Sequence, residues 1–178
     1  RPAANWLYMS AEDFANQFVL ALKTRKLDAF RSRIRQTDLL AIDDIHFLAS
    51  KPATQEEFLH TFNTIDLAGK QVVLASDAHP KQISQLSDKL VNRFVSGMVV
   101  KIEQSVLEMR SRIFSQFIQR LNRPVAVSVN VIQYLAENLV TNVRELEGAV
   151  MKVIAFSSQK SEKVSLSMAK AVLAEHLE

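Results

Sequence analysis

The feature that most constrains the fold of this chain is a change of pattern near residue 103. Before that point, short apolar runs alternate with amphipathic helical segments. The runs lie at residues 6–9, 39–42, 71–76 and 98–102. Strands that alternate with helices predict a parallel sheet, and continuous apolar runs are typical of strands buried on both faces. The first part, residues 1–103, is therefore predicted to be an α/β subdomain.

Helical spacing of apolar residues dominates the rest of the chain. In the first part it predicts helices at residues 11–24, around Leu27, Phe30 and Ile34, from Thr54 to Gly69, and at 82–94. After residue 103 it predicts helices at 105–121, 128–139, 142–158 and 165–176, with a helix end at 122–124. We therefore expect residues 104–178 to form a small all-helical subdomain.

The rarest residue types exclude several classes of protein. The chain has three glycines in 178 residues, and none are clustered. A phosphate-binding loop needs clustered glycines, so this stretch contains no P-loop motif. It has no cysteine, which excludes disulfides, thiolate zinc sites and a cysteine nucleophile. No apolar run is long enough to span a membrane, and we expect a cytoplasmic protein.

Positive charge is concentrated between Lys23 and Arg35, where six cations face one acid, Asp28. Two interpretations of this run remain open. It is either the solvated surface of a helix pair or a patch that faces phosphates, whose binding would weaken steeply with salt.

Acidic side chains follow two of the predicted strands. Asp43 and Asp44 come directly after the apolar run 39–42, and Asp77 follows the run 71–76. Ligands of parallel sheets bind at the carboxyl ends of the strands. Because successive side chains of a strand point to opposite faces, one of the paired acids could hold Mg²⁺ through water while the other orients an attacking water. The alternative is that these acids cap the turns that follow.

Two arginines are further candidates for an anion site. Asn142 and Glu145 have capping-box spacing, which places Arg144 in the first turn of a helix. A cation there opposes the helix dipole, and an anionic ligand would compensate for it. A surface salt bridge to Glu147 or Glu175 is the alternative. Arg93 precedes a predicted strand, and a guanidinium suits phosphate oxygens, although an arginine in such a place is more often a surface cation.

Several tracts together carry a resemblance to a known family. They are LLAIDDIHFL at 39–48, TQEEFLHTFN at 54–63, Ser76-Asp77, and NVRELEGA at 142–149. The sequence resembles the AAA+ domain (domain III) of the bacterial chromosomal replication initiators, the DnaA family. The resemblance covers essentially the whole chain, and the tracts at 54–63 and 142–149 are its most specific parts. It implies an AAA+ P-loop-NTPase-type sheet followed by a helical lid.

The resemblance also implies roles for individual residues. Asp43 and Asp44 correspond to the Walker B acids, which act on Mg²⁺ and water, and Asp77 to sensor 1. Arg93 corresponds to the arginine finger that touches the ATP of a neighbouring subunit, and Arg144 to the sensor 2 arginine of the lid. The implied cofactors are ATP or ADP with Mg²⁺, held by Asp43 through water. The implied activity is that of a weak ATPase whose nucleotide controls self-assembly.

The implied partners are nucleic acids and other proteins. Val19, Lys51 and Thr54 correspond to positions near the channel in which a filament of such domains binds single-stranded origin DNA. Duplex origin DNA and the replicative helicase are further implied partners, and the location is cytoplasmic and nucleoid-associated. Ala53 departs from the pattern, because a basic residue is usual there.

The resemblance places the family's first strand and P-loop before Arg1 and its duplex-binding domain after Glu178. The first strand would then lie between the strands at 71–76 and 98–102. Without a P-loop, this stretch by itself is not expected to turn over ATP. Two other readings are a P-loop-lacking AAA+ adaptor that regulates an initiator, and an AAA+ protein that resembles a helicase loader. The complete set of candidate residues argues against the adaptor, and the tract at 54–63 argues against the loader.

Overall fold

The structure is a computed structural model that describes residues 4–121, 126–160 and 163–174. The chain divides into two compact units, residues 1–100 and residues 101–178. In the described residues, no helix is both long and apolar enough to cross a membrane.

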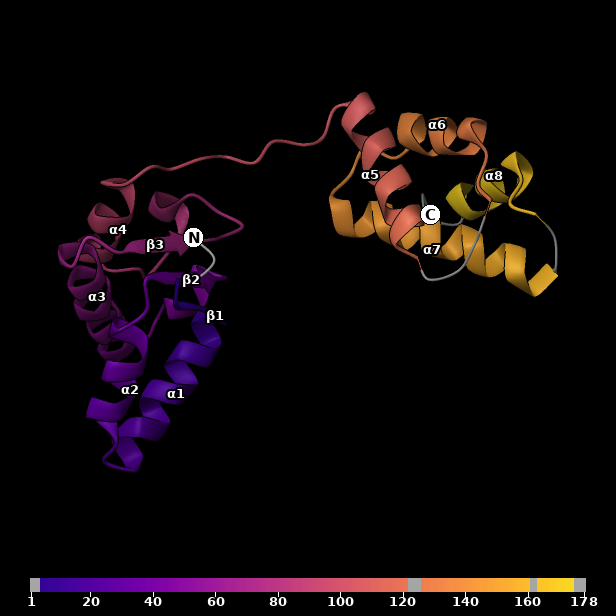
Figure 1. The fold of residues 1–178 in the computed structure, drawn as a ribbon. Helices are drawn as coiled ribbons and strands as arrows, with labels where there is room; N and C mark the ends of the chain where they lie inside the picture. The colour runs from indigo at the N-terminus through magenta and orange to yellow at the C-terminus, as the bar shows by residue number, and fades with distance from the viewer. Residues whose placement is uncertain (1–3, 122–125, 161–162, 175–178) are drawn as a thin grey trace. The chain divides into compact units, whose positions relative to one another are not determined.

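The first unit is built on a sheet of three parallel strands, in the order β1-β2-β3. These are β1 (Trp6–Ser10), β2 (Leu39–Asp43) and β3 (Gln71–Leu74). The predicted parallel sheet flanked by helices is confirmed, and Figure 1 shows the three strands beside the helices of this unit. The strand at 71–76 ends two residues earlier than predicted.

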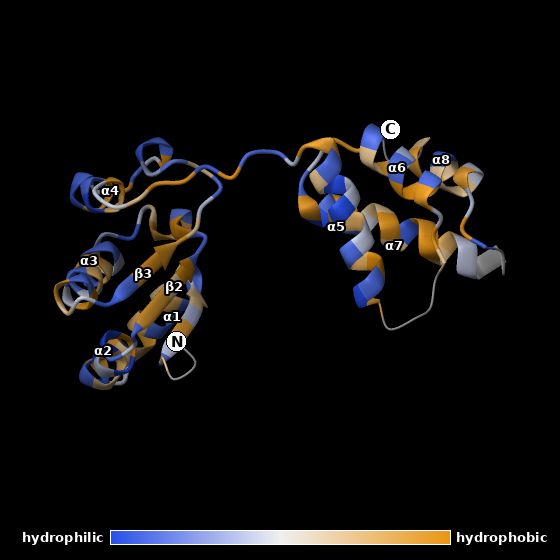
Figure 2. Ribbon diagram, turned by 45° about the horizontal axis from the view of Figure 1, so that its top comes forward, coloured by the Kyte–Doolittle hydropathy of each residue, from blue (hydrophilic) through white to orange (hydrophobic). Residues whose placement is uncertain are grey.

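Burial of the strands on both faces was predicted, and this was wrong. The prediction concerned the runs that become β2 and β3, where Leu40 and Ile42 are buried on one face but Val73 is 47% exposed in the described part of the chain. The alternation follows from the pleat, which sends successive side chains to opposite faces. Figure 2 shows that β2 and β3 are nonetheless mostly hydrophobic.

Four helices and two short 3-10 turns complete the first unit. They are α1 (Ala11–Lys23), α2 (Leu27–Arg35), η1 (Ile45–Leu48), α3 (Pro52–Leu67), η2 (Pro80–Gln82) and α4 (Asp88–Val95). The predicted cap of α1 is confirmed, because Ser10 Oγ accepts a hydrogen bond from Asp13 N at 3.0 Å. The buried Phe14 ring packs edge-on against Phe30 and Phe58, with centroids 5.3 and 5.1 Å apart.

Two helix starts of the first unit differ from the prediction. The helix expected from Thr54 begins at Pro52, because a proline at the first helical position has no N–H to lose and a φ that suits the helix. The helix expected at 82–94 begins only at Asp88. Before it, Gln85 has a φ of 61°, a left-handed conformation that a helix does not tolerate.

The predicted strand at 98–102 does not form. Residues 98–102 have no regular secondary structure, and Met98 and Ile102 are more than nine-tenths exposed. A strand is stabilised by ladder hydrogen bonds to a neighbour, and none of the described strands pairs with this segment.

The described residues of the second unit form four helices. These are α5 (Leu107–Arg120), α6 (Val129–Asn138), α7 (Val143–Lys160) and α8 (Leu166–Ala174). They enclose a core of aliphatic residues around Phe114. The buried Arg110 ties α5 to the last turn of α6, since its Nε donates to the carbonyl of Ala136 at 2.8 Å. The predicted helix end at 122–124 and residues 175–176 lie outside the described residues.

Candidate functional site

Backbone hydrogen bonds bring the acidic residues of β2 and β3 to one edge of the sheet. Ala75 N donates to Ile42 O at 2.9 Å, and Ile45 N donates to Ala75 O at 3.1 Å. These bonds extend the pairing of β2 and β3 past the end of β3. As a result Asp43 and Asp44 lie beside the segment that carries Asp77. The predicted proximity of the two strand ends is therefore found in the structure.

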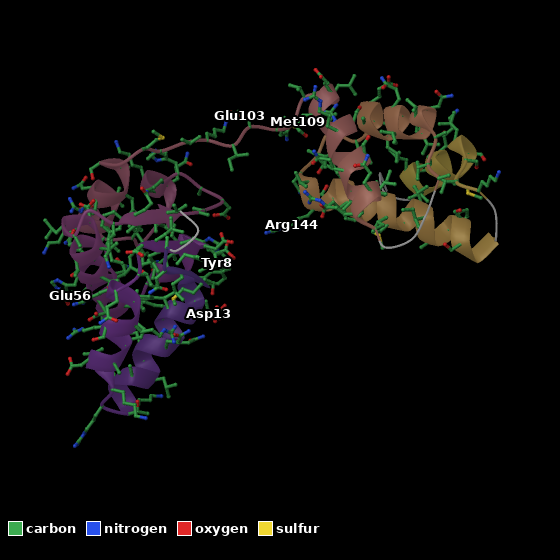
Figure 3. All side chains as sticks on the ribbon, in the orientation of Figure 1. Tyr8, Asp13, Glu56, Glu103, Met109 and Arg144 are labelled. Carbon is green, nitrogen blue, oxygen red and sulfur yellow. The ribbon has the colours of Figure 1, made fainter. Side chains whose placement is uncertain are left out.

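Asp43 is held by two hydrogen bonds. Its Oδ2 accepts from the hydroxyl of Tyr8 at 3.0 Å, and its Oδ1 accepts from Asp44 N at 2.9 Å. Tyr8 comes from the neighbouring strand, so the carboxylate is fixed across β1 and β2. Figure 3 labels Tyr8 at this part of the first unit.

Asp44 has a left-handed backbone, with φ 55° and ψ 50°. Aspartate adopts this conformation more readily than most residues, but it remains uncommon outside turns and functional sites. Asp44 lies between the end of β2 and the start of η1. The neighbouring Asp43 and Asp44 therefore differ in backbone conformation: Asp43 is in the strand, and Asp44 is left-handed.

A histidine that the sequence analysis did not assign to the site joins the two acidic segments. His46 Nδ1 lies 3.3 Å from Asp77 Oδ1 and 4.0 Å from Asp44 Oδ1. Its ring packs against Phe47, with centroids 4.5 Å apart. The signal in the sequence is its position two residues after Asp44, which the η1 turn folds back toward Asp77.

The residues of this edge fit Mg²⁺ only when water supplies most of its ligands. In the described residues, no group of three histidine, aspartate or glutamate side chains could hold a metal ion. Both oxygens of Asp43 already accept one hydrogen bond each, but each has a second acceptor site. Mg²⁺ usually keeps several waters and binds one or two carboxylates together with substrate phosphates. Asp43 suits such a water-mediated contact.

Arg93 lies at a different place in the first unit. It is in the last turn of α4, where its Nη2 donates to Asp66 Oδ2 at 2.7 Å and its guanidinium lies 5.5 Å from the ring centre of Phe62. Asp66 is in the last turn of α3. Because α3 connects the end of β2 to the start of β3, this turn lies at the sheet edge opposite the acids. The side chain of Arg93 is 33% exposed.

Arg144 belongs to the second unit. The predicted capping box is present, because Asn142 Oδ1 accepts from Glu145 N at 3.0 Å and Asn142 Nδ2 donates to Glu145 Oε1 at 2.7 Å. This places Arg144, which is exposed, in the first turn of α7 (Figure 3). Within the described residues, neither Glu147 nor any other acid forms an ion pair with it, so only Glu175, outside that part, remains as the predicted salt-bridge partner.

The three predicted DNA positions differ in accessibility. Val19 on α1 is 42% exposed. Lys51 precedes α3, and its Nζ donates to the carbonyl of Phe47 at 2.8 Å. Thr54 is buried in the first turn of α3, with 5% of its surface exposed. In this structure Thr54 therefore offers almost no surface to a DNA strand.

The basic run from Lys23 to Arg35 is partly neutralised within the protein. Arg31 and Arg35 both pair with the buried Glu57 of α3, at 2.6 and 2.9 Å. The hydrogen bond to Glu57 raises the pKa of Arg31 above its ordinary value. Arg33 donates to Gln17 at 2.7 Å. The cations left exposed without such contacts are Lys23, Arg25 and Lys26, so only this end of the run suits a patch that faces phosphates.

The fold and the acidic edge define an AAA+ ATPase-type domain, and comparison with known proteins agrees. Residues 1–101 match the family model described as the bacterial DnaA ATPase domain. The chain belongs to the DnaA family. It is 43% identical over 177 residues to the chromosomal replication initiator protein DnaA of Herpetosiphon aurantiacus, covering 99% of this chain and 37% of that protein.

Solved structures give the same result. Domain III of the replication initiation protein DnaA from Thermotoga maritima matches with a TM-score of 0.88 and 34% identity, covering 98% of this chain and 72% of that one. A replication initiator DnaA bound to AMPPCP and single-stranded DNA matches with a TM-score of 0.77 and 38% identity, over 90% of this chain and 50% of that one. The chain spans about a third of the length of the curated relatives it matches.

Proposed function

We propose that this chain is the nucleotide-responsive part of a bacterial replication initiator, in which ATP controls self-assembly on origin DNA. The observation that carries the proposal is the gathering of Asp43, Asp44 and Asp77 at the carboxyl edge of a parallel sheet. This is where such sheets bind their ligands. The relative that was solved with AMPPCP and single-stranded DNA supports both ligand classes.

Each acid has a distinct part in the proposed mechanism. Asp43, fixed by Tyr8 and by the backbone of Asp44, holds the hydration shell of Mg²⁺. Bound Mg²⁺ supplies charge neutralisation for the phosphates. Asp44 orients the attacking water, and Asp77 senses the terminal phosphate. No phosphate-binding loop lies in this stretch, so the site is completed by residues of the full-length protein, and this stretch alone does not turn over ATP.

The two arginines connect the nucleotide to assembly. Arg93 lies away from the acids of its own chain, which suits contact with the ATP of a neighbouring subunit. Arg144 is an exposed cation at a helix start, where an anion would offset its unfavourable position. We infer that it contacts the nucleotide from the lid.

DNA is the proposed partner of the assembled form. Val19 and Lys51 are the accessible members of the proposed strand-binding set, and Lys23, Arg25 and Lys26 add long-range attraction. Duplex origin DNA and the replicative helicase are further proposed partners of the whole protein.

The test compares ATP binding and ATP-dependent assembly in the full-length protein. We expect Arg93→Ala to leave the ATP Kd of the monomer within about twofold while abolishing ATP-dependent assembly in light scattering. Lys81→Ala, an exposed cation outside the site, is the matched control and should assemble normally. Loss of monomer ATP affinity in Arg93→Ala would show that the arginine acts within its own chain.

A further inference from the structure

The guanidinium of Arg93 is held from two sides by α3. Asp66 Oδ2 accepts a hydrogen bond from Nη2 at 2.7 Å, and the Phe62 ring lies under the guanidinium at 5.5 Å. Phe62 is itself fixed, because its ring packs against Phe94 with centroids 6.1 Å apart. Arg93 therefore has a defined position although a third of its side chain is exposed.

The position of Asp66 is unfavourable for the helix that carries it. It lies in the last turn of α3, where no basic residue is present and where a negative charge opposes the helix dipole. The ion pair with Arg93 compensates for that position. Substituting Asp66 by a neutral residue is consequently not expected to destabilise α3.

Asp66 does not use all the hydrogen-bonding capacity of Arg93. A guanidinium carries five N–H donors. One Nη2 bond goes to Asp66, and Nη1 donates no hydrogen bond within the part of the chain that the structure describes, whereas Nε is also unpartnered but is buried and does not face a second anion. Arg93 can thus keep its contact with Asp66 and still donate to a second anion.

We propose that Asp66 is a positioning residue for the contact between Arg93 and the nucleotide of a neighbouring subunit, an inference that rests on the proposed function. A free arginine side chain loses considerable rotamer freedom when it is immobilised by a ligand. Asp66 and Phe62 restrict Arg93 before the neighbour arrives, so less freedom is lost on assembly. Asp66 itself touches no nucleotide.

The alternative role for Asp66 is inhibitory, and it predicts the opposite change in assembly when Asp66 is removed. A carboxylate that competed with the neighbour's phosphates for Arg93 would inhibit assembly, and its removal would strengthen assembly. Preorganisation predicts that its removal weakens assembly. The direction of the effect separates the two roles.

The experiment measures, in the full-length protein with ATP, the protein concentration at which assembly is half complete. We expect Asp66→Ala to raise this concentration about tenfold, through the lost restriction of Arg93, and Asp66→Asn to raise it less because its amide oxygen still accepts from Nη2. Asp66→Glu, which restores the carboxylate, should return it to within about twofold of the unsubstituted protein. The ATP Kd of the monomer should stay constant in all three variants.

Glu56→Gln is the matched control, since it removes one negative charge from the same helix. Glu56 is exposed on α3 and is labelled in Figure 3, and it makes no contact with Arg93 among the contacts of the described residues. It should assemble normally. Unchanged or stronger assembly of Asp66→Ala, or a loss that Asp66→Glu does not reverse, would overturn the positioning role. If Arg93→Ala itself assembled normally, the proposed function of Arg93 would fail instead.

Discussion

Two charged regions of the first unit differ in whether their charges are paired within the protein. In the basic region on α2, Arg31 and Arg35 share the carboxylate of Glu57, whose side chain is only 4% exposed. In the acidic region at the end of β2 and β3, the side chains of Asp44 and Asp77 are 50% and 74% exposed. No described lysine or arginine forms an ion pair with these acids. The imidazole of His46 lies beside both of them.

This difference in pairing distinguishes charges that stabilise the fold from charges that are available to a ligand. A buried carboxylate is costly unless it is paired and hydrogen-bonded, and Glu57 meets that condition with two arginines. At the sheet edge, the side chains of Asp44 and Asp77 are half or more exposed and form no ion pair with a described lysine or arginine. Exposed carboxylates of this kind add little to stability and are suited to a cation brought in with a ligand. Substitutions in the two regions should therefore affect different properties.

The largest expected effect is the loss of ATP hydrolysis in Asp44→Asn of the full-length protein. Removing a group that orients the attacking water should lower kcat by about 100-fold or more. Asparagine tolerates the left-handed backbone at this position, and one fewer carboxylate reduces repulsion at the sheet edge. The free energy of unfolding should therefore stay the same or rise slightly, as measured by denaturant unfolding.

The reverse result for Asp44→Asn would contradict this distinction between the acidic and the basic region. If Asp44→Asn hydrolysed ATP at the unsubstituted rate and lost stability, the acidic edge would be a structural region like the basic one. The Asp77→Asn variant provides an independent check, because Asp77 belongs to the other segment of the same edge.

A smaller effect, on stability rather than activity, is expected for Glu57→Gln. Breaking a fully buried ion pair costs about 3–5 kcal/mol, but Arg31 and Arg35 are partly exposed and can be hydrated, so we expect about 2 kcal/mol. Unfolding followed by circular dichroism should show this loss in the transition of the first unit. Glu56→Gln, on the same helix but exposed, should unfold as the unsubstituted protein does.

The charge of Arg31 determines how the stability of this ion-paired region depends on pH. Its hydrogen bond with Glu57 raises a pKa that already lies far above neutrality. A group with a raised pKa stabilises the fold fully below its unfolded pKa and loses that contribution only as the pH rises through the folded value. The stability contributed by the charge of Arg31 should therefore be the same at pH 6 and pH 9. A marked difference between these two values would point to another group.

The sequence was sufficient to predict the elements whose signals are local. The periodicity of Phe14 and Phe18 and the Ser10 cap define α1, and the Asn142–Glu145 capping box defines the start of α7. The apolar run that precedes Asp43 was enough to place the acids at a sheet edge. Each of these depends on residues within one or two turns of one another.

Features that depend on distant partners could not be predicted in this way. Residues 98–102 have the composition of a buried strand, but a strand requires a hydrogen-bonded neighbour, and apolar content does not supply one. Glu57 has capping-box spacing from Thr54, yet tertiary pairing with Arg31 and Arg35 determines its role. The proximity of His46 to Asp77 likewise depends on a distant partner, because the hydrogen bond from Ile45 N to Ala75 O holds η1 beside the segment after β3.

The smallest expected effect concerns single-stranded DNA and tests whether Lys51, a cation outside the basic region, contacts a ligand. Lys51 is the lysine of the proposed strand-binding set, and among the described residues its Nζ donates to the carbonyl of Phe47 alone. Lys51→Ala should reduce the slope of log affinity against log salt by about 0.7, the value for one phosphate contact on a single strand. The measurement is binding of the ATP-bound, full-length assembly over a range of salt concentrations.

Lys26→Ala is the control for general electrostatic attraction. Lys26 is exposed in the basic run but is not a proposed contact, so its removal should weaken binding slightly through the overall field and reduce the slope by much less than the loss of a phosphate contact does. If Lys51→Ala and Lys26→Ala gave the same slope, Lys51 would contribute only to the field. The proposed DNA contact would then have to be sought elsewhere on the surface that carries Val19.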